Sequence, residues 1–438
     1  MNIALAKTDR GRAVSDAFAD ARDRLPGVGN VAEVRRQAFA AYERLGLPHR
    51  RIEEWKYTDL RALMGEVKPL AQKPDAAALE RARAALQAHA VAGGTKLVLV
   101  DGVFVAELSD AAGAGVSVRT LREVLENSGN DARADLLVTN TTDAMISLNA
   151  ALATDGVVVD VADGVTLSAP IQIVHVATAS SASAFTRSHV RIGKGARATL
   201  VESFVAAVGA GGYQVHDAVI LWVGDGAEFS HVRLMADATD AVNITSEILT
   251  VGAKAKLNLF NMTSGGAVSR LQGFFNLAGE GSELSVNGVN LLKGKQHGDT
   301  TLVIDHAVPH CVSREIFRAV VDDRAHSVFQ GRIIVRPNAQ KTDGKMMTRA
   351  LLLSDEAEAD NKPELEIFAD DVTCGHGATA GALDDSLLFY LRARGLPEKE
   401  AQALLIQAFV GEAIEGIGDD NLRELAMAQA ERWLEARG

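Results

Sequence analysis

The chain has only two cysteines, Cys311 and Cys374, among its 438 residues. Two thiols exclude a framework of several disulfides, and they exclude an iron-sulfur site of four cysteines within one chain. Any iron-sulfur cluster held by this protein would have to be shared with a second chain.

Basic and aromatic residues are also scarce. The chain has 45 Lys and Arg against 57 Asp and Glu, a net charge of -12, and only 5% aromatic residues. Because binding to phosphate backbones requires a basic surface, we expect no nucleic acid partner. No apolar run approaches the roughly 18 residues of a membrane span, and the first residues lack the apolar region of a secretory signal. We therefore expect a cytoplasmic protein without a membrane partner.

Glycine is abundant, with 39 residues, and it occurs in a repeated phrase between about residues 155 and 375. Each phrase places a Gly or Asp turn before a small residue and an alternating strand. The copies recur at intervals of about 26 to 32 residues, as in repeat architectures. They begin at Gly193, Gly224, Gly252 and Gly279, and Asp322 and Asp355 begin similar later phrases.

This repeat predicts a mainly β protein built on a right-handed parallel β-helix, also called a β-solenoid, in which each coil stacks on the next. Helical periodicity before and after the repeat predicts helical domains on both sides. We therefore divide the chain into an N-terminal helical domain (residues 1–92), a strand-rich segment with the β-helix core (93–378) and a C-terminal helical domain (379–438). The last domain should contain three helices, over residues 386–394, from Pro397 onward, and over residues 421–436.

Cys374 and His376 form the most informative motif, since residues two apart on a strand project to the same face. Sulfur and imidazole nitrogen together suit zinc, copper or iron-sulfur chemistry. Two ligands make only half of a closed site, so a surface half-site completed by a partner is one interpretation. A buried cysteine beside a hydrogen-bonded histidine is the structural alternative.

Other candidate motifs are weaker. The segment from Asp305 to Cys311 contains two histidines, but Pro309 prevents the regular helix that a His pair at i, i+4 would need. We expect these residues to fix a coil corner. No phosphate loop, nucleophile elbow or zinc-protease motif is present, so no sequence motif argues for an enzyme.

Several segments together resemble the SufB/SufD family of the SUF iron-sulfur cluster assembly machinery, and within it the SufD branch. The matching text includes Glu54-Trp55-Lys56-Tyr57-Thr58, Phe329-Gln330-Gly331-Arg332, Pro363-Glu364-Leu365-Glu366-Ile367, Cys374-Gly375-His376-Gly377-Ala378-Thr379 and Leu388-Phe389-Tyr390-Leu391. SufB carries a thiol before its equivalent strand, whereas this chain has Thr348-Arg349-Ala350-Leu351 there, and SufB has His-Glu-Ala-Thr where this chain has His376-Gly377-Ala378-Thr379.

The resemblance implies a non-catalytic scaffold subunit of a SufB-SufC-SufD complex, accessory to the SufC ATPase. It implies pairing with SufB through the β-helix, and a nascent iron-sulfur cluster that is transient, shared with SufB, and not permanently bound by the isolated chain. His376 falls on the position assigned to an iron ligand, and Cys374 on the neighbouring thiol. An isolated chain could instead pair with itself as a homodimer. The resemblance assigns no role to Cys311.

The resemblance also implies that the SufC ATPase binds the C-terminal helices, which carry an apolar surface. The candidate docking residues are Leu388, Phe389, Tyr390, Leu391, Leu404, Leu405 and Phe409. Two alternatives remain open. One is a β-helix enzyme that processes polysaccharide, although such enzymes are mostly secreted and rich in groove aromatics. The other is a purely structural partner of SufB and SufC, in which His376 only packs.

Overall fold

The computed structural model describes residues 9–64, 68–88, 91, 93–127, 133–138 and 143–437. Residue 92, at the expected first domain boundary, lies outside these residues. The helices are α1 (Asp9–Ala21), η1 (Arg22–Arg24), α2 (Asn30–Leu45), η2 (Glu53–Trp55), α3 (Leu60–Leu63), α4 (Ala76–Ala88), η3 (Ala106–Leu108), α5 (Leu121–Glu126), η5 (Ala134–Leu137), α6 (Ala144–Leu152), α7 (Asp385–Ala393), α8 (Glu398–Ile414) and α9 (Asp420–Glu435). The three expected C-terminal helices correspond to α7, α8 and α9.

The strands fill most of the chain between α4 and α7. They are β1 (Thr95–Val100), β2 (Val103–Phe104), β3 (Val116–Thr120), β4 (Val157–Val161), β5 (Ile171–Ala177), β6 (Ser183–Ile192), β7 (Arg197–Ala206), β8 (Gln214–Val223), β9 (Glu228–Ala236), β10 (Val242–Val251), β11 (Lys256–Thr263), β12 (Val268–Leu277), β13 (Glu283–Leu292), β14 (His297–His306), β15 (Val312–Val321), β16 (His326–Val335), β17 (Asp343–Leu352), β18 (Glu358–Ile367) and β19 (Thr373–Gly381).

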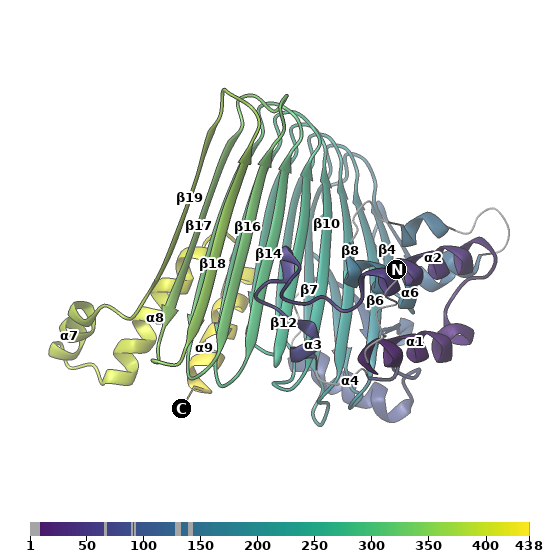
Figure 1. Ribbon diagram of the computed structural model, residues 1–438, viewed down its shortest axis with the longest axis horizontal. Helices are drawn as coiled ribbons and strands as arrows, with labels where there is room; N and C mark the ends of the chain where they lie inside the picture. Colours follow the sequence, from purple (N-terminus) through teal and green to yellow (C-terminus); the bar gives the residue numbers. More distant parts are fainter. Residues whose placement is uncertain are drawn as a thin grey trace, which may run out of the picture.

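These strands form two facing sheets. The 10-stranded sheet has the order β19-β17-β15-β13-β11-β9-β7-β5-β1-β2, and the 9-stranded sheet has the order β18-β16-β14-β12-β10-β8-β6-β4-β3. From β4 onward the chain alternates between the two sheets, and neighbouring strands are parallel. The result is a parallel β-solenoid of about 8 turns, so the predicted fold is confirmed (Figure 1).

Small residues at the turns explain how the coils stack. The residue after the turn is fully buried in five successive coils, at Ala196, Ala227, Ala255, Ser282 and Cys311. In each coil the preceding residue has a positive φ, and it is glycine in three of the five. The Cys311 Sγ lies 3.3 Å from the Ser282 hydroxyl of the coil below. Cys311 is therefore a stacking residue of the core, as the coil-corner interpretation expects.

The two later phrases occupy a different corner of the solenoid. The turns that begin at Gly193, Gly224 and Gly252 lead from the 9-stranded sheet to the 10-stranded sheet. Those that begin at Asp322 and Asp355 lead in the opposite direction, from β15 to β16 and from β17 to β18. Similar turn chemistry serves both corners, because both corners require a tight reversal and a small residue that stacks.

Helices cover the outer faces of both sheets. On the 10-stranded sheet, buried side chains of α8 and α9, including Ile406, Val410 and Trp433, pack on outward-facing strand residues such as Val232 and Val320. On the 9-stranded sheet, α6 and the segment around Trp55 bury outward-facing residues near the beginnings of β6, β10 and β12. Among the described residues no helix is long and apolar enough to cross a membrane.

The two ends of the solenoid differ. At one end β1, β2 and β3 extend the sheets beyond β4 and β5, and β2 and β3 pair antiparallel with their neighbours. At the other end lie β18 and β19, and α7 projects away from the body of the protein (Figure 1). The interior between the sheets is apolar along most of its length and continues to Leu365, Val372 and Cys374 at this second end.

Candidate functional site

Cys374 and His376 lie on β19, the last strand of the 10-stranded sheet. Their register partners on β17 are Gly344 and Met346, and Met346 is 2% exposed inside the solenoid. Because partners in register point to the same face of a sheet, both side chains point toward the interior. No further coil covers them among the described residues, so Cys374 remains half-buried and His376 exposed. The expected shared face is therefore present.

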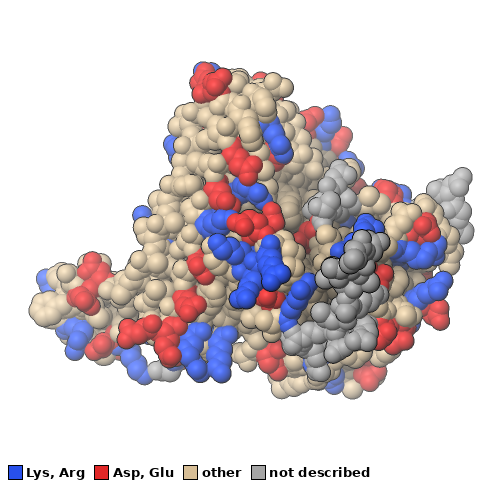
Figure 2. Space-filling model, viewed as in Figure 1, with Lys and Arg blue, Asp and Glu red and all other residues tan. Residues whose placement is uncertain are grey.

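The coil that holds these residues has open strand edges. β18 and β19 end their sheets, so each has one edge without a neighbouring strand in the described part of the chain. β19 carries no Lys, Arg, Asp or Glu, and the surface beside it shows few charged side chains (Figure 2). Ile367 at the end of β18 and Phe368 just after it are 41% and 59% exposed. A long, uncharged edge of this kind is a template for pairing with another chain.

Burial changes the chemistry of the Cys374 thiol. It raises the pKa of Cys374 above its ordinary value of 9.0, because the thiolate would be partly removed from water. The thiol is therefore protonated at neutral pH and becomes a metal ligand only when an ion displaces the proton. Of the two residues, His376 is the more accessible donor.

A buried carboxyl lies behind the pair. Glu315 on β15 is the register partner of Met346, which separates it from His376 along the interior face. Glu315 is 0% exposed; the Ser313 side chain is near enough to favour its ionised form, but no hydrogen bond of normal geometry reaches either carboxyl oxygen among the described residues. Burial raises the pKa of Glu315 to about 8, so this carboxyl is protonated at neutral pH. It is a neutral polar group within the apolar interior.

The segment from Glu54 to Thr58 packs on the outer face of the 9-stranded sheet. The Arg270 guanidinium stacks 3.7 Å from the centre of the Trp55 ring, and Trp55 is 2% exposed. The Thr58 Oγ1 lies 2.9 Å from the His297 Nε2, and both Thr58 and Arg270 donate hydrogen bonds to Asp299. The segment therefore anchors the N-terminal region to the β-solenoid.

The structure separates the candidate docking residues into two groups. Exposed side chains lie on α7 and on one face of α8: Phe389 is 75%, Tyr390 53% and Leu404 46% exposed. Leu388, Leu391, Leu405 and Phe409 are half-buried. Phe409 packs toward the solenoid, where the Arg318 guanidinium lies 5.6 Å from its ring centre. The apolar surface of this region thus centres on α7, none of whose residues is buried.

A groove of about 910 Å³ crosses the outer face of the 9-stranded sheet and includes the exposed Trp222. The polysaccharide-enzyme alternative would need a pair of free acids in a groove of this kind. Its three carboxylates, however, each pair with an arginine: Asp135 with Arg133 at 2.8 Å, Asp160 with Arg191 at 2.7 Å and Asp305 with Arg336 at 2.6 Å. The described lining residues therefore offer no free pair of acids for glycoside hydrolysis.

Sequence reasoning missed two sets of interior polar residues. One is Glu315, and the other is a cluster around His175, Glu202 and Asp217. Each stands at an inward position of an alternating strand, where the pattern calls for an apolar residue. A charged residue in phase with buried apolar neighbours was the signal that could have identified them.

The chain is similar to known proteins over most of its length. A family model described as "SUF system FeS cluster assembly, SufBD core domain" matches residues 175–409, and one described as "SufBD protein N-terminal region" matches residues 16–173. The iron-sulfur cluster assembly protein SufD of Escherichia coli (strain K12) is 33% identical over 88% of this chain and 89% of its own length.

Two further relatives extend the comparison. An iron-sulfur cluster assembly SufBD family protein of Synechocystis sp. is 29% identical over 85% of this chain and 84% of its own length. SufD of Bacillus subtilis is 27% identical over 66% of each chain. With its β-solenoid and both family segments matched, the chain belongs to the SufBD family of SUF-system iron-sulfur cluster assembly proteins.

Proposed function

We propose that this chain is a non-catalytic scaffold subunit of a SufB-SufC-SufD complex, and that His376 helps to bind the nascent cluster where the chain meets SufB. The observation that carries the proposal is the open, uncharged edge of β19 with a thiol and an imidazole on its interior face. A β-solenoid partner that continues the stack would cover this edge and complete the ligand set. The cluster is the cargo of such a complex.

The chemistry of the pair suits a cluster that is built and then released. Imidazole can replace thiolate as an iron ligand, and it raises the cluster potential relative to ligation by thiolates alone. Cys374 must lose a proton to bind iron, and burial makes that loss harder. Two weak or conditional ligands retain a cluster less firmly than four thiolates. We therefore assign His376 the main role and Cys374 an accessory one.

The exposed face of α7 is the proposed docking site for the SufC ATPase. Phe389 and Tyr390 on α7 and Leu404 on α8 expose large apolar side chains. Helices that present such residues commonly dock in a groove of a partner. α8 itself is tied to the solenoid through an ion pair between Arg318 and Glu412, so movement of the docked ATPase could be transmitted to β15.

The test is anaerobic co-expression with SufB and SufC, followed by analysis of iron and acid-labile sulfide per complex. His376→Ala should leave the complex intact and lower its cluster content. His310→Asn serves as a matched control, because His310 is exposed in a turn and asparagine tolerates its positive φ of 61°. Equal cluster content in wild type and His376→Ala would support a purely structural partner instead.

A further inference from the structure

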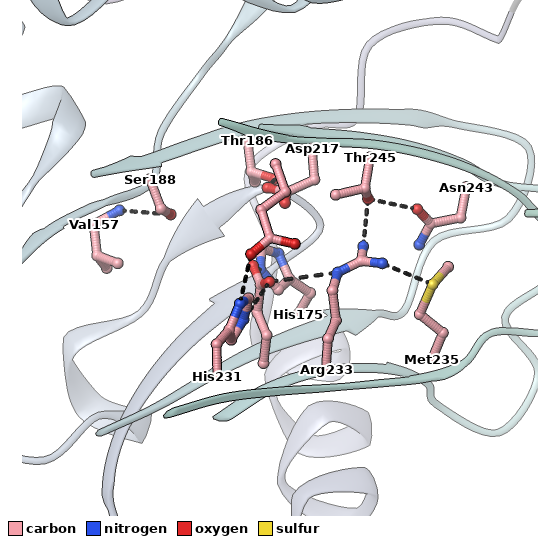
Figure 3. Close-up of polar contacts among 12 residues, drawn as sticks. Val157, His175, Thr186, Ser188, Asp217, His231, Arg233, Met235, Asn243 and Thr245 are labelled. Carbon is pink, nitrogen blue, oxygen red and sulfur yellow. Dashed lines mark hydrogen bonds and ion pairs between the residues drawn. The ribbon is translucent and has the colours of Figure 1, made fainter. Parts of the chain in front are cut away.

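A second group of potential ligands lies in the interior of the solenoid, far along the chain from β19. His175 on β5, Glu202 on β7 and Asp217 on β8 approach one another between the two sheets, and Figure 3 shows His175 and Asp217 there. Their exposed fractions are 7%, 0% and 1%. One ligand atom from each residue can be chosen so that all three lie within 4.8 Å of one another.

The Asp217 Oδ2 in this cluster has no hydrogen-bond partner among the described residues. Glu202 makes only long ion pairs, 3.4 Å from the His175 Nε2, 3.3 Å from the His231 Nε2 and 3.4 Å from the Arg233 Nε. The other Asp217 oxygen accepts a hydrogen bond of 2.6 Å from Thr186, which fixes the carboxyl in place. Leaving a buried polar atom unpaired costs free energy, so the unpaired Asp217 oxygen, beside a Glu202 carboxylate with only long contacts, indicates a missing ligand.

The charges around the cluster indicate that this ligand is a cation. Glu202, Asp217 and Glu247 supply three carboxylates. Two positive charges lie beside them: Arg233, 3.4 Å from Glu202, and His231, whose pKa Glu247 and Glu202 raise to about 9 despite its burial. His231 lies between Glu202 and Glu247, at 3.3 and 3.0 Å. A dry interior does not tolerate excess negative charge, so either protons on the imidazoles and carboxyls or a metal ion must neutralise it.

The cluster also has room for small ligands. A cavity of about 30 Å³ adjoins it at His175 and is also lined by Thr186, Phe204 and Asp237, whereas Glu202 and Asp217 do not line it. That volume exceeds the roughly 10 to 15 Å³ that one water molecule needs. The cavity is also lined by residues that are only half-buried, such as Asp101, so it approaches the protein surface.

We propose that His175, Glu202 and Asp217 bind one divalent first-row transition metal ion, such as Fe²⁺ or Zn²⁺. One imidazole and two carboxylates are ligands that these ions accept, and water molecules would complete the coordination. Ligand atoms at about 2.1 Å from one ion lie up to about 4 Å from each other. Shifts of less than about 1 Å in the three side chains would therefore bring their ligand atoms to this spacing. This site is separate from β19 and does not depend on the proposed function.

The test uses the untagged full-length chain with Cys374→Ser and His376→Gln, so that the residues on β19 cannot bind the probe. Titration with Co²⁺, followed by visible absorption, should show one bound ion per chain. Asp217→Asn keeps the shape of the side chain and its contact with Thr186, and it should lower the Co²⁺ affinity by at least about tenfold. Glu315→Gln is the matched control, since it also replaces a fully buried interior carboxyl with an amide, and it should leave the affinity unchanged.

A second measurement keeps the test informative if Asp217→Asn folds poorly. Zn²⁺ should raise the melting temperature of the background chain, since a ligand that binds the folded state stabilises it. Zn²⁺ should not raise the melting temperature of the Glu202→Gln variant. The proposal is overturned if the background chain binds no Co²⁺, or if the ligand variants bind it as tightly as the Glu315→Gln control.

Discussion

Replacement of Glu315 by glutamine should remove a large pH dependence of stability. The Glu315 carboxyl is fully buried without a hydrogen bond of normal geometry among the described residues, and burial raises its pKa to about 8 from the ordinary value of 4.5. Below pH 4.5 the carboxyl is protonated in both the folded and the unfolded chain. As the pH rises further, the unfolded chain releases this proton while the folded chain retains it. The free energy of unfolding therefore falls with rising pH until about pH 8.

The size of this effect follows from the linkage between proton binding and folding. One proton of difference changes the free energy of unfolding by about 1.4 kcal/mol per pH unit. Over the interval from pH 4.5 to pH 8 the wild type should lose on the order of 4 kcal/mol relative to Glu315→Gln. Glutamine has nearly the same shape as the protonated carboxyl and does not titrate. The variant should therefore be the more stable protein at pH 8.

Urea unfolding of the two proteins at pH 5, 6, 7 and 8 measures this difference directly. Other titrating groups also contribute to the pH dependence of stability in both proteins. Their contributions cancel in the comparison unless the groups contact Glu315. Glu356→Gln, at an exposed turn residue, is a control that should follow the wild type at every pH. Parallel curves for wild type and Glu315→Gln would refute the argument, because they would mean that the carboxyl is hydrated or paired in the folded protein.

Three further predictions concern binding and packing. Phe389→Ser combined with Leu404→Ser should abolish capture of SufC in a pull-down while leaving the melting temperature nearly unchanged, because both side chains are exposed; retained capture would place the docking site elsewhere. Trp55→Ala should lower the free energy of unfolding by about 3 to 5 kcal/mol, as it removes a buried ring and its contact with Arg270; a loss below 1 kcal/mol in urea unfolding would argue against that packing. Cys311→Ala should cost about 1 kcal/mol or less in the same assay, because alanine already fills the equivalent position of other coils, whereas a larger cost would show that the thiol does more than stack.

The repeated turn phrase made the β-solenoid predictable. A positive-φ residue followed by a small one leaves a clear local pattern, because the position after the turn is fully buried between coils and has no room for a bulky side chain. The same rule explains Cys311 as a stacking residue. The C-terminal helices were also predictable, because their caps and their 3.6-residue period are local features.

The sites were harder to predict because they depend on contacts between distant coils. Sequence shows that Cys374 and His376 share a face, but only the register with Met346 shows that this face is the interior. From sequence alone, the apolar residues of α8 could not be divided into buried and exposed ones. The division depends on distant contacts, such as that of Phe409 with Arg318, about 90 residues earlier in the chain. The cluster around Asp217 is assembled from strands whose neighbours in space are not neighbours in sequence.

The most direct test of the central claim is whether a histidine nitrogen of this chain binds the cluster. The complex would be assembled anaerobically with this chain alone labelled with ¹⁵N-histidine, and the reduced cluster studied by pulsed electron paramagnetic resonance. We predict a ¹⁵N coupling of the strength typical of directly bound imidazole, present in wild type and in His310→Asn and lost in His376→Ala. A cluster without this coupling in the wild type, or with the same coupling in His376→Ala, would contradict the assignment of His376 as a ligand.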